Sequence, residues 1–94
     1  MYRDEVLDVA KALVTKEREA QHGPADRNAE IIAGLWSAYT GKKISKHDVS
    51  VMLALMKIGR LASGDPSVED HWVDAIGYLS IGVEVCTVNS SDPM

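Results

Sequence analysis

Two short segments of this chain place charged side chains one helical turn apart. Lys57 and Arg60 are three residues apart, and Asp70, Asp74 and Tyr78 recur at every fourth residue. Side chains at these spacings share one face of a helix. Arg offers a planar fork, and Lys a point charge, to a phosphate or carboxylate. The two segments therefore predict either a site for an anionic ligand or an ion-paired contact between two helices.

The carboxylates suggest a second chemistry, since Mg²⁺ and Mn²⁺ prefer oxygen ligands. Asp70 and Asp74 could contribute to such a site, with His71 between them as a further ligand. Two carboxylates alone make an incomplete site, and Asp70 equally suits the first turn of a helix. We therefore predict no metal site, no catalytic residue and no cofactor.

Three further residues have a binding and a structural interpretation. Arg27 and Asn28 follow the Gly23-Pro24 break, where the exposed N–H groups of a new helix attract anions. The same segment could equally be an ordinary solvated connection. Trp36 could stack on a nucleobase or belong to the core. Cys86 has no neighbouring base in a motif, and no Walker loop, GxGxxG, CxxC or HExxH sequence occurs.

Hydrophobic periodicity predicts four helices and no strand. They cover residues 2–18, 25–39, 46–62 and a segment that opens at Pro66, with Ser45–Asp48 and Ser67–Asp70 spaced as capping boxes. The fold class is therefore all-α: a four-helix bundle-like domain whose third and fourth helices form a hairpin. Residues 1–88 make the single domain, and 89–94 a flexible tail.

Apolar residues mark the faces expected to pack in the core. They are Ile31, Ile32, Leu35, Trp36 and Tyr39 in the second helix, and Trp72, Val73, Ile76, Leu79, Val83 and Cys86 in the fourth. The third helix is apolar on most sides, which predicts burial in the domain or between subunits. Gly77 and Gly82 disfavour a helix and predict a close approach by another helix or a ligand.

The composition and charge of the chain restrict the classes of partner that it could bind. The 94 residues carry a net charge of −4, which argues against binding to duplex nucleic acid. No apolar run is long enough to span a membrane, and the start of the chain has no signal-peptide pattern. We expect a cytoplasmic protein.

The stretch from about residue 20 to 84 resembles a family of short, mostly phage-encoded proteins of uncharacterised function. The resemblance rests on Gly23 and Asn28, LWSAY (35–39) with Gly41, Asp48-Val49, KIGRL (57–61), Asp70 and WVDAIGY (72–78). The first motif of that family usually contains a tyrosine, an aspartate and a proline. Here it reads His22-Gly23-Pro24-Ala25 and departs from the pattern.

More distantly, the predicted hairpin resembles the all-α nucleoside triphosphate pyrophosphatases of the MazG-like group. Those enzymes hold Mg²⁺ with ExxE on one helix and ExxD on the next. The resemblance puts Asp74 at the ExxD aspartate and His71 at the first acid, while Lys57 and Arg60 fall near the ExxE pair. It also implies a dimer or tetramer with the ligand near a subunit interface.

An exchange of acids for bases favours holding a phosphate over cutting it, because the metal that would activate water loses its ligands. We therefore expect a homo-oligomer that binds a small anionic nucleotide without cleaving it. By analogy, the ligand would be a cyclic oligonucleotide signal of CBASS-type bacterial defence, sequestered by a phage counter-defence sponge. The expected contacts are Lys57, Arg60, Asp74, Tyr78, Arg27, Asn28 and Trp36.

Two alternatives remain open. One is an active Mg²⁺-dependent pyrophosphohydrolase that uses Asp70, Asp74 and acids such as Glu30 or Glu69. The other is a structural or interaction protein in which Lys57 and Arg60 pair internally with Asp70 and Asp74.

Overall fold

The computed structural model describes residues 1–17 and 24–88, and within these ranges the chain is helical with no strand. The elements are α1 (Arg3–Ala12), the π-helical turn η1 (Leu13–Glu17), α3 (Ala25–Thr40), α4 (Lys46–Ser63) and α5 (Glu69–Thr87). The all-α class is therefore confirmed. The predicted tail, 89–94, lies outside the described residues. No helix in the described part is long and apolar enough to cross a membrane.

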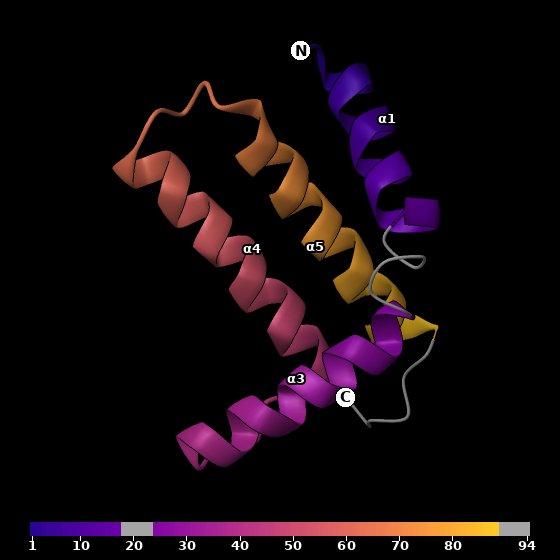
Figure 1. Ribbon diagram of the computed structural model, residues 1–94, viewed down its shortest axis with the longest axis vertical. Helices are drawn as coiled ribbons and strands as arrows, with labels where there is room; N and C mark the ends of the chain where they lie inside the picture. Colours follow the sequence, from indigo (N-terminus) through magenta and orange to yellow (C-terminus); the bar gives the residue numbers. More distant parts are fainter. Residues whose placement is uncertain (18–23, 89–94) are drawn as a thin grey trace.

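The antiparallel hairpin of α4 and α5 forms the centre of the molecule (Figure 1), as the short connection between them predicts. Helix α1 packs along α5, on the side away from α4. Helix α3 lies across the end of the hairpin where α4 begins and α5 ends. Because α3 crosses the hairpin instead of running beside it, the helices do not form a regular four-helix bundle.

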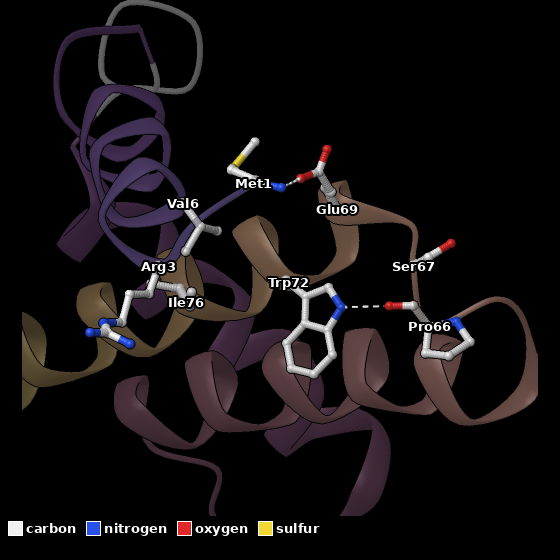
Figure 2. A pocket seen from close by; sticks show the side chains of 8 residues that line it. All are labelled: Met1, Arg3, Val6, Pro66, Ser67, Glu69, Trp72 and Ile76. Atoms are coloured by element: carbon white, nitrogen blue, oxygen red, sulfur yellow. Dashed lines mark hydrogen bonds and ion pairs between the residues drawn. The ribbon is translucent and has the colours of Figure 1, made fainter.

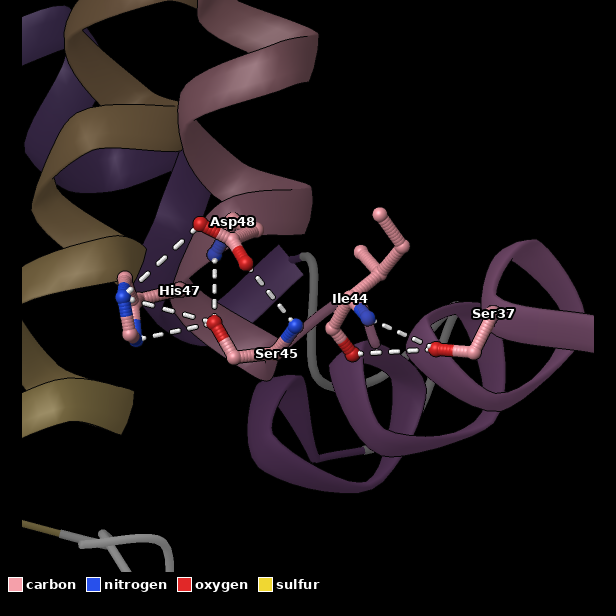
Figure 3. A network of polar contacts seen from close by, with 5 residues as sticks. All are labelled: Ser37, Ile44, Ser45, His47 and Asp48. Atoms are coloured by element: carbon pink, nitrogen blue, oxygen red, sulfur yellow. Dashed lines mark hydrogen bonds and ion pairs between the residues drawn. The ribbon is translucent and has the colours of Figure 1, made fainter. Parts of the chain in front are cut away.

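The connection from α3 to α4 is fixed by local hydrogen bonds (Figure 3). Gly41 adopts φ 70° and caps α3, which favours glycine because a side chain is strained there. The amide of Ile44 donates to Ser37 Oγ at 2.8 Å. The amide of Ser45 donates to Asp48 Oδ2 at 3.0 Å, and the amide of Asp48 donates to Ser45 Oγ at 3.3 Å. The predicted Ser45–Asp48 capping box is thus confirmed.

The predicted start of the fourth helix is wrong. Helix α5 begins at Glu69 with Val68 as its N-cap, not at Pro66. Both the amide and the hydroxyl of Ser67 donate to Asp65 Oδ1, at 2.9 and 2.7 Å, and these bonds hold the pKa of Asp65 below its ordinary value. Ser67 therefore closes a turn with the preceding aspartate and does not cap the helix.

The first helix is also shorter than predicted. Regular α-helix ends at Ala12, and the next five residues form the π-helical turn η1. The hydroxyl of Thr15 donates to the Lys11 carbonyl oxygen at 2.8 Å within this change of winding. The turn carries Val14 against the core cluster of α3 and α5.

Small residues make most of the core, which differs from the predicted apolar faces. Alanines of α3 pack with aliphatic residues of α5 in a cluster of Ala25, Ala29, Ile81 and Val85. By contrast, Leu35 and Tyr39 are 64% and 92% exposed, and Ile31, Trp72, Leu79 and Val83 are also exposed. The prediction that these large side chains line the core is wrong for the single chain.

Two glycines of α5 permit close helix packing, as predicted. A Cβ on Gly77 would lie 2.9 Å from Val14 Cγ1, and one on Gly82 would lie 3.0 Å from Ser50 Cβ. Gly77 therefore lets η1 approach α5, and Gly82 lets α4 approach it. Neither glycine has a positive φ, so the requirement is for space and not for backbone freedom.

Candidate functional site

An ion pair joins the two helices of the hairpin at the predicted site. Lys57 Nζ on α4 lies 2.8 Å from Asp74 Oδ2 on α5, and the two side chains are 15% and 30% exposed. This pairing is the structural interpretation of the two segments, and it is present. Lys57 is nevertheless not fully buried, because both side chains of the pair remain in contact with solvent.

One turn nearer the α4–α5 connection, Arg60 and His71 stand at the same level of the hairpin. Arg60 follows Lys57 by three residues while His71 precedes Asp74 by three, and the helices are antiparallel. Arg60 is exposed and forms no ion pair within residues 1–17 and 24–88, so its predicted pairing with Asp70 is absent there. His71 Nδ1 is buried without a hydrogen-bond partner. The register set by the ion pair thus puts Arg60 and His71 on neighbouring turns of the two helices, next to Lys57 and Asp74.

Tyr78 stands one turn beyond Asp74 on α5, and both line a small cavity between α5 and η1. The cavity has a volume of about 80 Å³ and is otherwise lined by Leu13, Val14, Gly77 and Ile81. Pockets for small-molecule ligands usually measure about 300 to 1,000 Å³. A nucleotide at this place would therefore lie on the open surface of the hairpin, with at most one group entering the cavity.

The three predicted residues of α3 lie elsewhere. Arg27 is exposed in the first turn of α3, beside Asp26, whose carboxylate binds Lys46 Nζ at 2.8 Å. Lys57 follows Lys46 by eleven positions on α4, which is about 16 Å at 1.5 Å per residue. Arg27 and Asn28 are thus at the far end of the hairpin from Lys57 within one chain.

Trp36 is farther along α3 and half-buried. His22 and Gly23, which begin the predicted anion-binding segment, lie outside the described residues. The single chain therefore does not assemble the seven predicted contacts into one site: only Lys57, Arg60, Asp74 and Tyr78 cluster on the hairpin.

The residues present do not suit a divalent metal. Among the described residues no group of three or more His, Cys, Asp or Glu side chains could hold an ion. Asp74 is already paired with Lys57. The carboxylate of Glu69 is paired with the amino group of Met1, with Oε2 2.7 Å from the nitrogen. Glu30 belongs to α3. We therefore derive no step through a metal.

A larger cavity, of about 560 Å³, lies between the start of α1 and the start of α5 (Figure 2). Its walls are Met1, Arg3, Val6, Pro66, Ser67, Glu69, Trp72 and Ile76. Trp72 Nε1 donates to the Pro66 carbonyl oxygen at 2.8 Å, which fixes the indole at the edge of the cavity. Sequence reasoning missed this hollow because it assigned Trp72 to the core. An aromatic residue next to a proline-containing turn was the only available signal.

Comparison with known proteins gives a family without an assigned activity. Residues 5–86 match a domain of unknown function, DUF6378. The gene 55 protein of Mycobacterium phage L5 is 35% identical over 77 residues, covering 81% of this chain and 49% of that protein. The gene 55 protein of Mycobacterium phage D29 is 36% identical over 75 residues, covering 80% and 49%. The chain spans about half the length of these curated relatives. No solved structure matches it.

Proposed function

We propose that this protein, which belongs to the DUF6378 family of phage proteins of unknown function, binds an anionic nucleotide without hydrolysing it. The observation that supports the proposal is the register of the α4–α5 hairpin. It pairs Lys57 with Asp74 and puts Arg60 at the same height as His71, one turn nearer the connection. In the MazG-like pyrophosphatases, which the hairpin resembles, acids occupy the corresponding positions. We propose the same fold here, with cations in place of two of those acids.

In this proposal Asp74 orients the Lys57 ammonium, and the nucleotide phosphate approaches from solvent. An ammonium group has three donors, so Lys57 can bind Asp74 and a phosphate oxygen together. Arg60 adds a bidentate fork one turn away. Tyr78, one turn beyond Asp74, supplies a ring and a hydroxyl toward the base. Neither cation generates a hydroxide nucleophile as a bound metal does, so the ligand leaves unchanged.

The biological role that we propose is sequestration of a cyclic oligonucleotide immune signal of CBASS type, in the cytosol of the infected host. A sponge requires affinity and no turnover, which suits a site with cations in place of metal ligands. A homo-oligomer, dimer or tetramer, would allow Arg27, Asn28 and Trp36 of one chain to complete the contacts made by the hairpin of another.

The Lys57–Asp74 ion pair also favours a second candidate, a structural or interaction protein whose charged hairpin holds its own helices together. The two candidates differ at Arg60. It has no role in the internal pair, whereas the nucleotide proposal makes it a phosphate contact.

Differential scanning fluorimetry with cyclic dinucleotides, cyclic trinucleotides, nucleoside triphosphates and ADP-ribose tests the proposal. A ligand that binds only the folded state raises the melting temperature by mass action. We expect one class to do so, and Arg60→Ala to weaken its binding at least about tenfold, since a charge-assisted contact contributes roughly 1.5–3 kcal/mol. Lys42→Ala, which removes an exposed lysine of the α3–α4 connection, is the matched control and should bind normally.

Chromatography of the ligand recovered after incubation with Mg²⁺ separates binding from catalysis. Intact ligand supports the proposal. Pyrophosphate release that disappears in Asp74→Ala would establish the pyrophosphohydrolase instead. No melting shift with any nucleotide, together with destabilisation by Lys57→Ala, would leave the structural candidate.

A further inference from the structure

One side of α4 is apolar and bare in the single chain. We call this surface the outer α4 face; it consists of Val51, Met52, Leu55, Met56, Ile58 and Gly59. The five large side chains are between 43% and 57% exposed. Helix α5 covers the opposite side, and among the described elements only α3 and α5 touch α4 (Figure 1).

The composition of this face is that of a buried surface. Between Asp48 and Lys57 the helix carries no charged residue on any side. A helix that is apolar all round is normally covered. Gly59 supports the same conclusion, because a Cβ there would meet nothing within 4 Å. In an exposed helix such a glycine costs up to about 1 kcal/mol relative to Ala. Among residues 1–17 and 24–88, no neighbour needs the space beside Gly59.

The charges at the two ends of the face indicate what covers it. Asp48 stands at the start, on the same stripe as Met52, Leu55 and Gly59, and Arg60 stands at the end. If two α4 helices met in parallel, each acid and each cation would face its own kind. If they meet antiparallel, Asp48 of one chain comes within about one helical turn of Arg60 of the other. The face is thus complementary to itself in one orientation.

We infer that a second copy of this chain covers the outer α4 face, with the two α4 helices antiparallel about a two-fold axis near Leu55. A two-fold interface uses the same patch on both subunits. Val51 of each chain then packs near Ile58 of the other, and Met52 near Gly59. The apolar residues of this interface lie on the side of α4 opposite to Lys57, so the assembly can be tested apart from the proposed nucleotide function; Arg60, at the edge of the face, is the residue that the two proposals share.

Analytical ultracentrifugation of the full chain and two glutamate variants tests the existence of the interface. We expect the wild type to have at least twice the chain mass of 10.2 kDa, and Leu55→Glu to reduce that mass by half or more. Leu7→Glu is the matched control, since Leu7 on α1 is 56% exposed and Leu55 is 57% exposed. Far-UV circular dichroism should show that both variants remain helical. A monomeric wild type at about 100 μM, well above the dissociation constants of specific complexes, would overturn the inference.

Cysteine cross-linking in a Cys86→Ala background tests the orientation. Leu55→Cys lies at the axis and should form a disulfide-linked dimer under mild oxidation, because the two copies of the residue face each other. Val51→Cys should not cross-link with itself, yet should do so with Ile58→Cys when the two variants are mixed. Self-linking at all three positions would indicate parallel helices, and no linking at any of them would indicate a different interface. Either result contradicts the inference.

Discussion

At the scale of single residues, the sequence predicts that Lys57 either binds an anionic ligand or pairs with a carboxylate of the neighbouring helix. In the structure it is paired with Asp74. The ion pair with Asp74 is neither fully exposed nor fully buried, with side-chain exposures of 15% and 30%. Its contribution should therefore lie between the 0–1 kcal/mol of surface pairs and the roughly 3–5 kcal/mol lost when a buried pair is broken.

A double-mutant cycle measures this ion pair. We expect Lys57→Met and Asp74→Asn each to lower the free energy of unfolding by about 1–2 kcal/mol, because each leaves a partner unpaired. The double variant should lose clearly less than the sum, since neighbouring residues are not additive. Urea denaturation gives all four values. Additive losses would mean that the two side chains do not interact in solution.

The Ser45–Asp48 capping box makes stability depend on pH. Hydrogen bonds from Ser45, the backbone amide first, hold the pKa of Asp48 below its ordinary value of 3.8. A carboxyl with a depressed folded-state pKa stabilises the protein above its unfolded pKa, and the effect is lost as the pH falls through the folded value.

Asp48→Asn should therefore cost stability at neutral pH and cost little at a pH below the folded-state pKa, where the carboxyl is protonated in both states. The side chain is 47% exposed, so we expect a modest loss of about 0.5 kcal/mol. Ser45→Ala, which removes the cap itself, should cost about 1 kcal/mol at both pH values. Thermal unfolding across the acid range measures both variants, and a pH-independent loss in Asp48→Asn would contradict the assignment.

At the scale of helices, local sequence predicts boundaries well where a side chain caps the helix. Helix α4 begins at Lys46 as predicted because Ser45 and Asp48 satisfy its free amides. The same spacing at Ser67 and Asp70 misleads, because Asp65 competes for Ser67. The buried face was not predictable by size: alanines are buried in α3, whereas Ile31, Leu35 and Tyr39 are exposed.

The partial assembly of the candidate site has the same origin. Periodicity identified α4 and α5 as neighbours, so Lys57 and Asp74 could be paired from sequence. Periodicity does not give the angle at which α3 crosses the hairpin, and that angle puts Arg27 near the start of α4, where Asp26 binds Lys46, and away from Lys57. Residues on one helix pair were therefore predictable as a cluster, and residues on the third helix were not.

The close contact between α5 and η1 at Gly77 can be tested by substitution. Gly77→Ala should lower the free energy of unfolding by about 1–3 kcal/mol, because the new Cβ would lie 2.9 Å from a methyl of Val14. Valine is stiff at χ1, so η1 has to move. Gly34→Ala on α3 is the control: nothing lies within 4 Å, and the substitution should stabilise the helix by up to about 1 kcal/mol. Chemical denaturation of both variants checks the contrast, and a stabilised Gly77→Ala would show that η1 does not pack as described.

At the scale of the whole molecule, many large apolar side chains lie on the surface, and the core is small. Large apolar side chains are exposed on α3, α4 and α5, while the core relies on alanine, valine and glycine. A chain of 94 residues has little core to stabilise it, and subunit association is a common remedy. The outer α4 face is the part of this surface for which the charge pattern indicates a second copy of the chain as the partner.

Association predicts that thermal stability depends on protein concentration, because a dimer dissociates when it unfolds. The melting temperature of the wild type should rise steadily as the concentration increases about a hundredfold, since mass action adds roughly 1.4 kcal/mol for each factor of ten. Leu55→Glu should melt lower and independently of concentration, while Leu7→Glu should retain the dependence. A melting temperature of the wild type that stays constant over this range would show that the folded unit is the single chain, and that its exposed apolar residues are tolerated without a second copy.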